Sequence, residues 1–405
     1  MNKGWQTKQL GELAELKGRI GWRGLTAKEY TKEGPLFLSV HSLNYGDYVD
    51  FRDAFHISEE RFVESPEIML QTNDVLICKD GAGIGKLGIL GELPGRATIN
   101  SSLLLIRSGK HILPKYLYRC LTSPYFQDIV QSRLNGATTP HLYQRDITEF
   151  PVVLPPLAEQ QRIVGLLDDA FEGLATAKAN AEKNLQNARA LFESHLQFVF
   201  TERGPGWVEK KLGEVSEFKN GLNYNKSSGG QTLPVVGVAD FQENYTVPLS
   251  ELQSATIDGD LADNYAIQPN DILTVRSNGS KHLVGRCMLV GEVDEVVSYS
   301  GFIIRIRFDA KVIFPQFLLH FMKCQVTRNV LTAGGGGANI TNINQEKLSS
   351  LLVPLPLYKT QVKLAAALDE MREETQGLVR LYERKLAALE ALKKSLLHQA
   401  FTGQL

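Results

Sequence analysis

The sequence predicts an α+β protein in which one unit is written twice, each copy being a strand-rich domain followed by a long helix. Three features predict this fold: an ordered set of repeated motifs, short apolar runs bounded by turn-forming residues, and two stretches with heptad spacing. We expect the strand-rich domains at 1–155 and 204–356 and the helices at 156–203 and 357–405. The helices are expected to pack as an antiparallel coiled coil with pseudo-twofold symmetry.

The repeat consists of matched motifs about 200 residues apart. Between these motifs the halves diverge, and residues 19–70 share almost nothing with residues 221–265. Shared motifs with divergent loops between them are expected if the two halves recognise different targets. The alternative is neutral drift after duplication. The matched pairs are 5–17 with 207–219, 73–76 with 270–273, 113–117 with 314–318, 167–168 with 368–369 and 200–201 with 401–402.

Each half begins with short apolar runs that are typical of strands. Residues 75–77, 102–106 and 302–306 are such runs, and Gly, Pro, Asn and Asp residues bound them. Each half then reaches a proline-rich junction, at 151–156 and at 354–356, which would end the preceding element.

After each junction, apolar and small residues fall at alternating steps of four and three. Heptad spacing over this length predicts a coiled-coil seam. The expected partner is the other helix of the same chain, with a self-pairing homodimer as the alternative. The predicted seam residues are Ile163, Leu167, Ala170, Leu174, Ala177, Ala181, Ala188, Leu191 and Phe198 in the first helix and Leu364, Leu368, Met371, Leu378, Tyr382, Leu389, Leu392, Leu396 and Ala400 in the second.

Composition narrows the class of protein without deciding its partner. The chain has 405 residues, a formal net charge of −1 and four cysteines that stand singly. This cysteine usage predicts reduced thiols, a cytoplasmic location and neither a disulfide nor a zinc site. No apolar stretch approaches the ~20 residues of a membrane span, so no membrane partner is expected. The near-neutral charge neither supports nor excludes a nucleic-acid partner.

A glycine motif at 83–88 matches the dinucleotide pattern GxGxxG literally. Strand and turn residues follow it where a dinucleotide site needs a helix, and Leu87 replaces the Ser or Thr of a phosphate-binding loop. We therefore interpret these residues as turn glycines. The sequence also lacks HExxH, GxSxG and methyltransferase signatures, which favours a binding protein without catalytic or metal-ligating residues.

The opening at 207–214, the junction Pro-Pro-Leu-x-Glu-Gln at 155–160 and the closing segment at 396–405 occur in a specific order. With their duplication, these motifs resemble the specificity subunit of type I restriction-modification systems over essentially the whole chain. The second junction departs from the pattern, because Thr360 stands where the first has Glu159. Docking at that end is therefore expected to be weaker or absent.

The resemblance implies that each strand-rich domain is a target-recognition domain that reads one half of a bipartite, asymmetric double-stranded DNA site. It implies that the helices set the gap and dock two modification subunits, with Glu159, Gln160 and Gln361 as the expected docking residues. The partners would hold the cofactors: S-adenosylmethionine in the modification subunits, and ATP and Mg in the restriction (motor-nuclease) subunits. This chain would then be no enzyme and hold no cofactor. The alternatives are a coiled-coil adaptor whose repeated domains bind protein, and a single-chain methyltransferase or nuclease.

Side-chain chemistry and loop position select the candidate DNA-binding residues. A glycine-rich loop recurs in both halves, at 135–141 and 334–342, and glycine lets backbone approach a ligand closely. Arg and Lys suit guanine or phosphate, and Asn and Gln suit adenine. The candidates are Lys79, Lys86, Thr138, Thr139, His141 and Gln144 in the first domain and Arg276, Asn278, Lys281, Asn339, Thr341 and Asn342 in the second.

Overall fold

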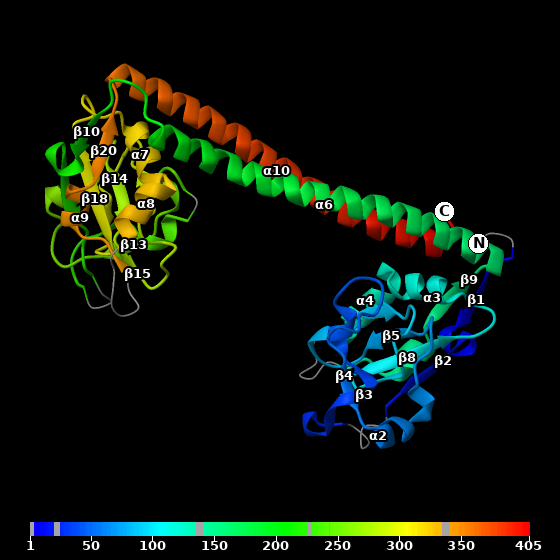
Figure 1. The fold of residues 1–405 in the computed structure, drawn as a ribbon. Helices are drawn as coiled ribbons and strands as arrows, with labels where there is room; N and C mark the ends of the chain where they lie inside the picture. The colour runs from blue at the N-terminus through cyan, green and yellow to red at the C-terminus, as the bar shows by residue number, and fades with distance from the viewer. Residues whose placement is uncertain (1–3, 20–24, 135–140, 225–227, 243, 334–340) are drawn as a thin grey trace. The chain divides into compact units, whose positions relative to one another are not determined.

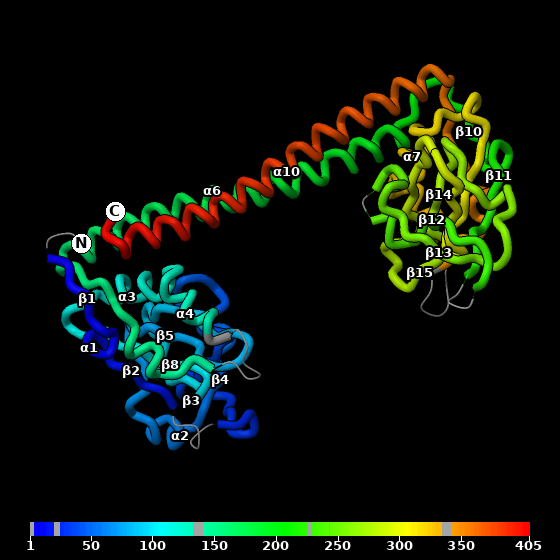
Figure 2. The backbone as a smooth tube through the Cα atoms, turned by 180° about the vertical axis from the view of Figure 1, so that it is seen from behind, coloured from blue at the N-terminus to red at the C-terminus, as the bar shows by residue number. Residues whose placement is uncertain are grey.

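The computed structural model describes residues 4–19, 25–134, 141–224, 228–242, 244–333 and 341–405. The chain forms two compact units. Unit 1 comprises Met1–Ala181 and Arg384–Leu405, and unit 2 comprises Glu182–Glu383. Each unit therefore contains one strand-rich domain together with parts of both long helices (Figures 1 and 2).

Nine strands and the last four helices of each half of the chain follow one another in the same order. In the first half of the chain they are β1 (Gln6–Gln9), α1 (Leu10–Leu13), β2 (Ala14–Gly18), β3 (Tyr30–Leu38), β4 (Phe55–Ile57), α2 (Glu59–Val63), β5 (Val75–Cys78), β6 (Leu87–Ile89), β7 (Ala97–Ile99), β8 (Leu103–Ser108), α3 (Pro114–Leu121), α4 (Pro124–Leu134), α5 (Gln144–Thr148), β9 (Pro151–Leu154) and α6 (Leu157–Thr201). In the second half they are β10 (Val208–Lys211), β11 (Ser216–Asn220), β12 (Thr232–Val236), β13 (Ser254–Thr256), β14 (Ile272–Val275), β15 (Ser277–Asn278), β16 (Cys287–Leu289), β17 (Ser298–Tyr299), β18 (Ile303–Phe308), α7 (Pro315–Lys323), α8 (Gln325–Thr332), β19 (Thr341–Asn342), α9 (Gln345–Ser349), β20 (Leu352–Leu355) and α10 (Tyr358–Thr402). Among the described residues, α1, α2, β15 and β19 each occur in one half only.

The sheets of the two units have matching strand orders. Unit 1 has an antiparallel sheet in the order β2-β8-β5-β6, a second sheet in the order β4-β3-β7 and the pair β1-β9. Unit 2 repeats these as β11-β18-β14-β16, β13-β12-β17 and β10-β20. In the second sheet of each unit one neighbour is parallel, β3 with β7 and β12 with β17. The two domains are therefore copies of one topology.

The continuous apolar runs in the sequence are strands with both faces covered. In β5, Val75 and Ile77 enter the hydrophobic cluster that contains the helices, whereas Leu76 and Cys78 enter the cluster on the other face. In β14, Ile272 and Leu273 divide in the same way. A strand buried on both faces reads as an unbroken apolar run because neither side meets water.

Each domain core is closed by the beginning of one long helix and the end of the other. In unit 1, Leu167 of α6 and Phe401 of α10 join the core, and the Phe401 ring lies 5.2 Å from that of Tyr116. In unit 2, Phe200 of α6 and Leu368 of α10 take these places. The repeated Phe-Thr motif therefore ends each long helix with an aromatic anchor in a domain core.

Two contacts within each unit confirm that α6 and α10 run antiparallel. In unit 1, Arg162 donates to Leu405 O at 3.0 Å, and Lys178 lies 2.8 Å from Glu390. In unit 2, Arg189 lies 2.8 Å from Glu383, and Phe200 and Leu368 join the same core. Within each unit the residue numbers rise along one helix as they fall along the other, as the predicted antiparallel coiled coil requires.

The predicted seam is wrong at the end of α6. Leu191 and Phe198 are 50% and 59% exposed, whereas Phe192, Leu196 and Phe200 are buried. The reason is that this end of α6 packs into the unit 2 core, where the Phe200 ring lies 5.4 Å from that of Phe317 of α7, so the buried face is no longer set by a single partner helix. Leu378 and Leu392 of α10, also predicted for the seam, are 39% and 48% exposed.

The repeated Leu-Gly-Glu opening has a packing explanation. A Cβ at Gly213 would lie 1.9 Å from Ser349 Oγ, and a Cβ at Gly11 would lie 2.4 Å from Thr148 Cγ2. Only glycine lets the opening segment approach the short helices α9 and α5 this closely.

Candidate nucleic-acid interface

The two loops chosen from the sequence meet in both units. In unit 1 the Leu142 N–H donates to Lys79 O at 2.9 Å, and Asp80 forms an antiparallel bridge with His141. In unit 2 the Ile343 N–H donates to Arg276 O at 2.8 Å, and β15 pairs with β19. We call these segments the paired loops: 79–86 with 141–144 in unit 1, and 276–286 with 341–345 in unit 2.

In unit 2, β15 lies at the end of the domain that is away from α6 and α10 (Figures 1 and 2). The paired loops of this unit are therefore separated from the helices by the body of the domain. That position leaves them accessible to a large ligand.

A repeated turn precedes the strand that leads into each pair of loops. Asn73 and Asn270 both adopt the left-handed conformation, with φ of 72° and 73°. The next residue in each case is a buried aspartate that accepts two hydrogen bonds from one arginine, Asp74 from Arg107 and Asp271 from Arg307. The repeated Asn-Asp motif therefore positions the loops and is not itself available to a ligand.

In unit 1 the candidate side chains already have partners within the domain. Lys79 Nζ lies 3.4 Å from an Asp80 carboxylate oxygen, and the same carboxylate is paired with His141. Lys86 Nζ donates to Asn44 Oδ1 at 2.6 Å. The exposed Gln144 donates weakly to a backbone carbonyl at 3.2 Å. This half presents cations that Asp80 partly neutralises.

In unit 2 the corresponding side chains have fewer hydrogen-bond and ion-pair partners among the described residues. The Arg276 Nε is buried and has no hydrogen-bond partner in the described part of the chain. Lys281 and Asn342 are exposed. Asn278 accepts the backbone N–H of Ser280 through Oδ1 at 2.8 Å. The two units thus place different chemistry on the same backbone frame.

Some predicted residues cannot be placed. Thr138, Thr139 and Asn339 lie outside the described residues, and for Thr341 the backbone belongs to β19 but the side chain is not described. Their assignment to DNA contact stays a prediction.

Gly83 and Gly85 of the GxGxxG segment are turn glycines, as interpreted from the sequence, but for Gly88 the interpretation is wrong, because Gly88 lies within β6 and pairs with Leu76. Strand β6 begins two residues after Gly85, which has a φ of 82° that favours glycine. A Cβ at Gly83 would lie 2.4 Å from Val40. No helix begins after this segment, so it cannot hold a pyrophosphate as a dinucleotide site does.

Sequence reasoning missed Arg286, which is the structural counterpart of Lys86. Each precedes the first residue of its strand, β6 or β16, and each follows a glycine with positive φ. Arg286 bonds to Gln242 O, much as Lys86 bonds to Asn44. The available signal was the glycine that precedes each residue, in Gly85-Lys86 and in Gly285-Arg286. Because the loop before Arg286 is longer, the two positions are not the same distance from the preceding strand.

The predicted docking glutamines are buried inside their own units. Gln160 is 0% and Gln361 is 1% exposed. Each accepts a backbone N–H, from Leu113 or Phe314, and donates to two backbone carbonyls. These amides fasten the long helix to the preceding loop, so the structure favours a positioning role over direct contact with a partner.

Glu159 remains partly exposed, with its two oxygens each 2.8 Å from the Arg162 guanidinium. The hydrogen bond from Arg162 lowers the pKa of Glu159. Arg162 also donates to Leu405 O at 3.0 Å. At the second junction the corresponding residues are Thr360 and Lys363, so this acid–base pair is present in only one copy.

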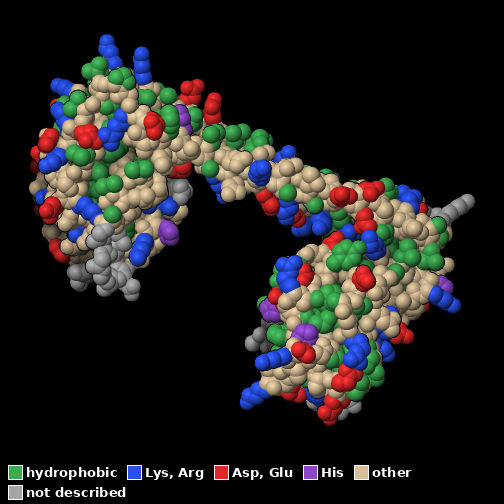
Figure 3. Space-filling view, in the orientation of Figure 1, with side chains coloured by type: hydrophobic (Ala, Val, Ile, Leu, Met, Phe, Trp, Pro, Cys, Tyr) green, Lys and Arg blue, Asp and Glu red, His purple; other side chains and the backbone are tan. Residues whose placement is uncertain are grey.

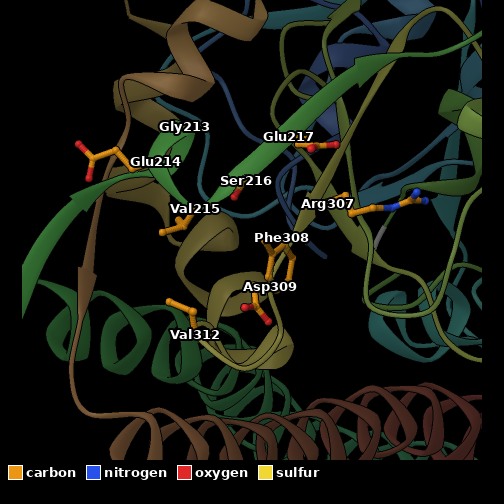
Figure 4. Close-up of a pocket in the computed structure, with 9 residues that line it drawn as sticks. All are labelled: Gly213, Glu214, Val215, Ser216, Glu217, Arg307, Phe308, Asp309 and Val312. Atoms are coloured by element: carbon orange, nitrogen blue, oxygen red, sulfur yellow. The ribbon is translucent and has the colours of Figure 1, made fainter.

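Figure 4 shows a pocket of about 540 Å³ in unit 2, lined from the Leu212–Glu214 turn, β11 and the end of β18. Glu214, Glu217 and Asp309 line it, and its one arginine, Arg307, is already bonded to Asp271. This acidic lining does not suit phosphate. No predicted DNA-binding residue lines the pocket.

On the face shown in Figure 3, basic side chains are interspersed with acidic ones. Within the described residues there is no group of three His, Cys, Asp or Glu side chains placed to hold a metal ion. In the same residues, no helix combines the length and apolarity that crossing a membrane requires.

A family model described as the type I restriction modification DNA specificity domain matches residues 2–185 and 205–386. The chain belongs to this family. It is similar to the type I restriction enzyme StySPI specificity subunit of Salmonella potsdam, with 22% identity over 424 residues that cover 100% of this chain and 89% of that protein.

Two solved structures confirm the fold class. One is a chain from work on complex assembly and conformational transition of the type I R-M system, with a TM-score of 0.78, 20% identity and coverage of 100% of this chain and 99% of that one. The other is the HsdS subunit from Thermoanaerobacter tengcongensis, with a TM-score of 0.61, 18% identity and coverage of 100% and 98%. Family membership confirms the prediction of a non-catalytic DNA-specificity subunit and does not favour the protein-binding adaptor.

Proposed function

We propose that the paired loops of unit 1 and unit 2 each read one half of a bipartite, asymmetric DNA site. The observation that carries this proposal is the shared backbone pairing with unlike side chains. Lys79, Asp80 and His141 stand in unit 1 where unit 2 has Arg276, Ser277 and Asn342. A common frame that presents different hydrogen-bonding groups suits the reading of two different sequences, because base edges differ in their donor and acceptor patterns.

The helices serve this reading by joining the two domains. Both α6 and α10 are uninterrupted over 45 residues. We infer that they fix the number of unread base pairs between the half-sites and carry two modification subunits, with which restriction subunits then assemble. The buried cysteines are compatible with action in the reducing cytoplasm.

Arg276→Ala tests the reading assignment. The variant is co-expressed with the modification subunit, and the modified sites are mapped across a genome. The expected result is relaxed specificity at a position of one half-site only, with a loss of about 1–3 kcal/mol in binding. Lys210→Ala, an exposed cation in β10, is the matched control and should leave the site unchanged.

Lys79→Ala should affect the opposite half-site. If both variants altered the same half-site, or neither altered any, the assignment of one reading surface to each unit would be wrong. Binding measured against salt adds an independent check, since contacts with phosphates release counterions and give a steep salt dependence.

Exchange of the junction residues tests docking. Glu159→Thr should weaken binding of one modification subunit, and Thr360→Glu, which places a carboxylate three positions before Lys363, should strengthen binding at the other junction. Stoichiometry by native mass spectrometry measures both. Unchanged affinity in both variants would move the docking surface away from this position.

A further inference from the structure

Phe302 is an exposed aromatic residue in the turn between β17 and β18 of unit 2. Its exposed fraction is 61%, and it belongs to no hydrophobic cluster of the described residues. Single exposed apolar side chains are common on protein surfaces and need no explanation by themselves. The position of Phe302 relative to the paired loops is what gives it meaning.

Phe302 lies beside Arg276. The last register pair of β14 and β18 is Val275 with Ile303, and the next residue on each strand is Arg276 and Phe302. The Arg276 N–H donates to Phe302 O at 2.9 Å. Phe302 is therefore the backbone partner of Arg276, whose buried Nε has no hydrogen-bond partner in the described part of the chain.

Unit 1 has a polar residue at the same place. The Lys79 N–H donates to Ser102 O at 2.8 Å, which makes Ser102 the counterpart of Phe302. The Ser102 hydroxyl donates to Asn100 Oδ1 at 2.7 Å, so this side chain is used within its own turn. The ring is thus a feature of one reading surface and is absent from its copy at this position.

The surroundings of Phe302 select DNA as the occupant of this surface. Arg276 and the exposed Lys281 supply positive charge, and Asn278 and Asn342 supply amides suited to base edges. Among the base edges of the major groove, the only methyl group is at C5 of thymine. A phenyl ring on a surface that also carries a cation and two amides matches a base pair that carries this methyl group.

We propose that Phe302 contacts the methyl group of a thymine in the half-site read by unit 2, and so contributes to sequence specificity. This inference rests on the proposed reading role of the paired loops. It adds that one position of this half-site is an A·T pair recognised by apolar contact.

The experiment uses the full chain in complex with its modification subunit and duplexes that carry the mapped target. Each thymine of the unit 2 half-site is replaced in turn by uracil, which removes only the methyl group. The wild-type complex should bind one of these duplexes roughly fourfold more weakly, the effect of one methyl-sized apolar group.

Phe302→Ser, which installs the unit 1 residue, should bind the thymine and uracil duplexes equally. Val296→Ser is the matched control, because Val296 is also an exposed apolar residue of unit 2, at 53%, and lies outside the paired loops. It should retain the roughly fourfold preference for thymine.

Three results would overturn the proposal: no uracil position weakens wild-type binding, Phe302→Ser keeps the preference, or the half-site contains no A·T pair. If Phe302→Ser weakened the thymine and uracil duplexes by the same factor, the preference would be kept, which is the second of these results and would indicate stacking instead. Failure of the proposed function itself would look different, since the wild-type complex would then show no site-specific, salt-dependent binding.

Discussion

Replacement of Gln160 by methionine tests whether the buried amide at the first junction holds the domain to its helix. Gln160 Oε1 accepts the Leu113 N–H at 2.8 Å, and Nε2 donates to His111 O at 3.0 Å and Pro155 O at 2.9 Å. Methionine preserves the length and approximate volume of the side chain. It removes all three hydrogen bonds.

The expected loss follows from these contacts. Each hydrogen bond contributes about 1 kcal/mol net, and each buried backbone group left without a partner costs about 1–3 kcal/mol. Because part of this penalty overlaps with the loss of the bonds, we expect the free energy of unfolding of unit 1 to fall by about 3–5 kcal/mol. Gln161→Met is the matched control: Gln161 is exposed, and the change should be within about 0.5 kcal/mol.

Urea unfolding of the full chain, followed by circular dichroism, measures the change. The two units need not unfold together, so the transition is fitted with separate steps. If Gln160→Met were as stable as Gln161→Met yet failed to bind the modification subunit, the structural reasoning would be refuted. Gln160 would then be a docking residue, as the family resemblance suggested.

Three further changes test other contacts in the structure. Gly213→Ala should destabilise unit 2 by about 1–3 kcal/mol in urea unfolding, because the new Cβ would overlap Ser349 Oγ; Gly229→Ala, with no atom within 4 Å of its Cβ, should be near neutral. Burial tends to raise the pKa of Asp168, but hydrogen bonds from Arg119 and Lys115 outweigh it and lower that pKa. The carboxylate therefore stabilises the fold at neutral pH. The difference in urea midpoint between wild type and Asp168→Asn should begin to shrink as the pH falls below about 4, where the unfolded chain takes up the proton, and should be lost below the lowered pKa of the folded state. A difference that did not shrink between about pH 5 and pH 2 would contradict this. Truncation after Gly206 removes α10 and its contribution to the unit 1 core, so the half-chain should dimerise through α6 and direct methylation to a palindromic site; methylation of the original asymmetric site would contradict the modular arrangement.

Local regularities made much of the fold predictable. Strands such as Val75–Cys78 and the two 45-residue helices are visible in the sequence because apolar runs and heptad spacing are properties of neighbouring residues. The ordered repeat predicted two domains of one topology, since a shared frame needs the same anchors in each copy. The packing of Phe401 and Gly213 now explains why two of those anchors recur.

The pairing of the loops was not contained in any local pattern. Asp80 and His141 are 61 positions apart, and only the register of the intervening strands brings them together. The same holds for the seam of α6, where Leu196 rather than Leu191 is buried because a domain core covers that end of the helix. Gln160 likewise matched a family motif, but its burial and hydrogen bonds set its role. Sequence by itself determined the repeat, the elements and the class of protein; tertiary structure decided which side chains meet, because contacts between distant residues depend on packing and strand register that no short segment encodes.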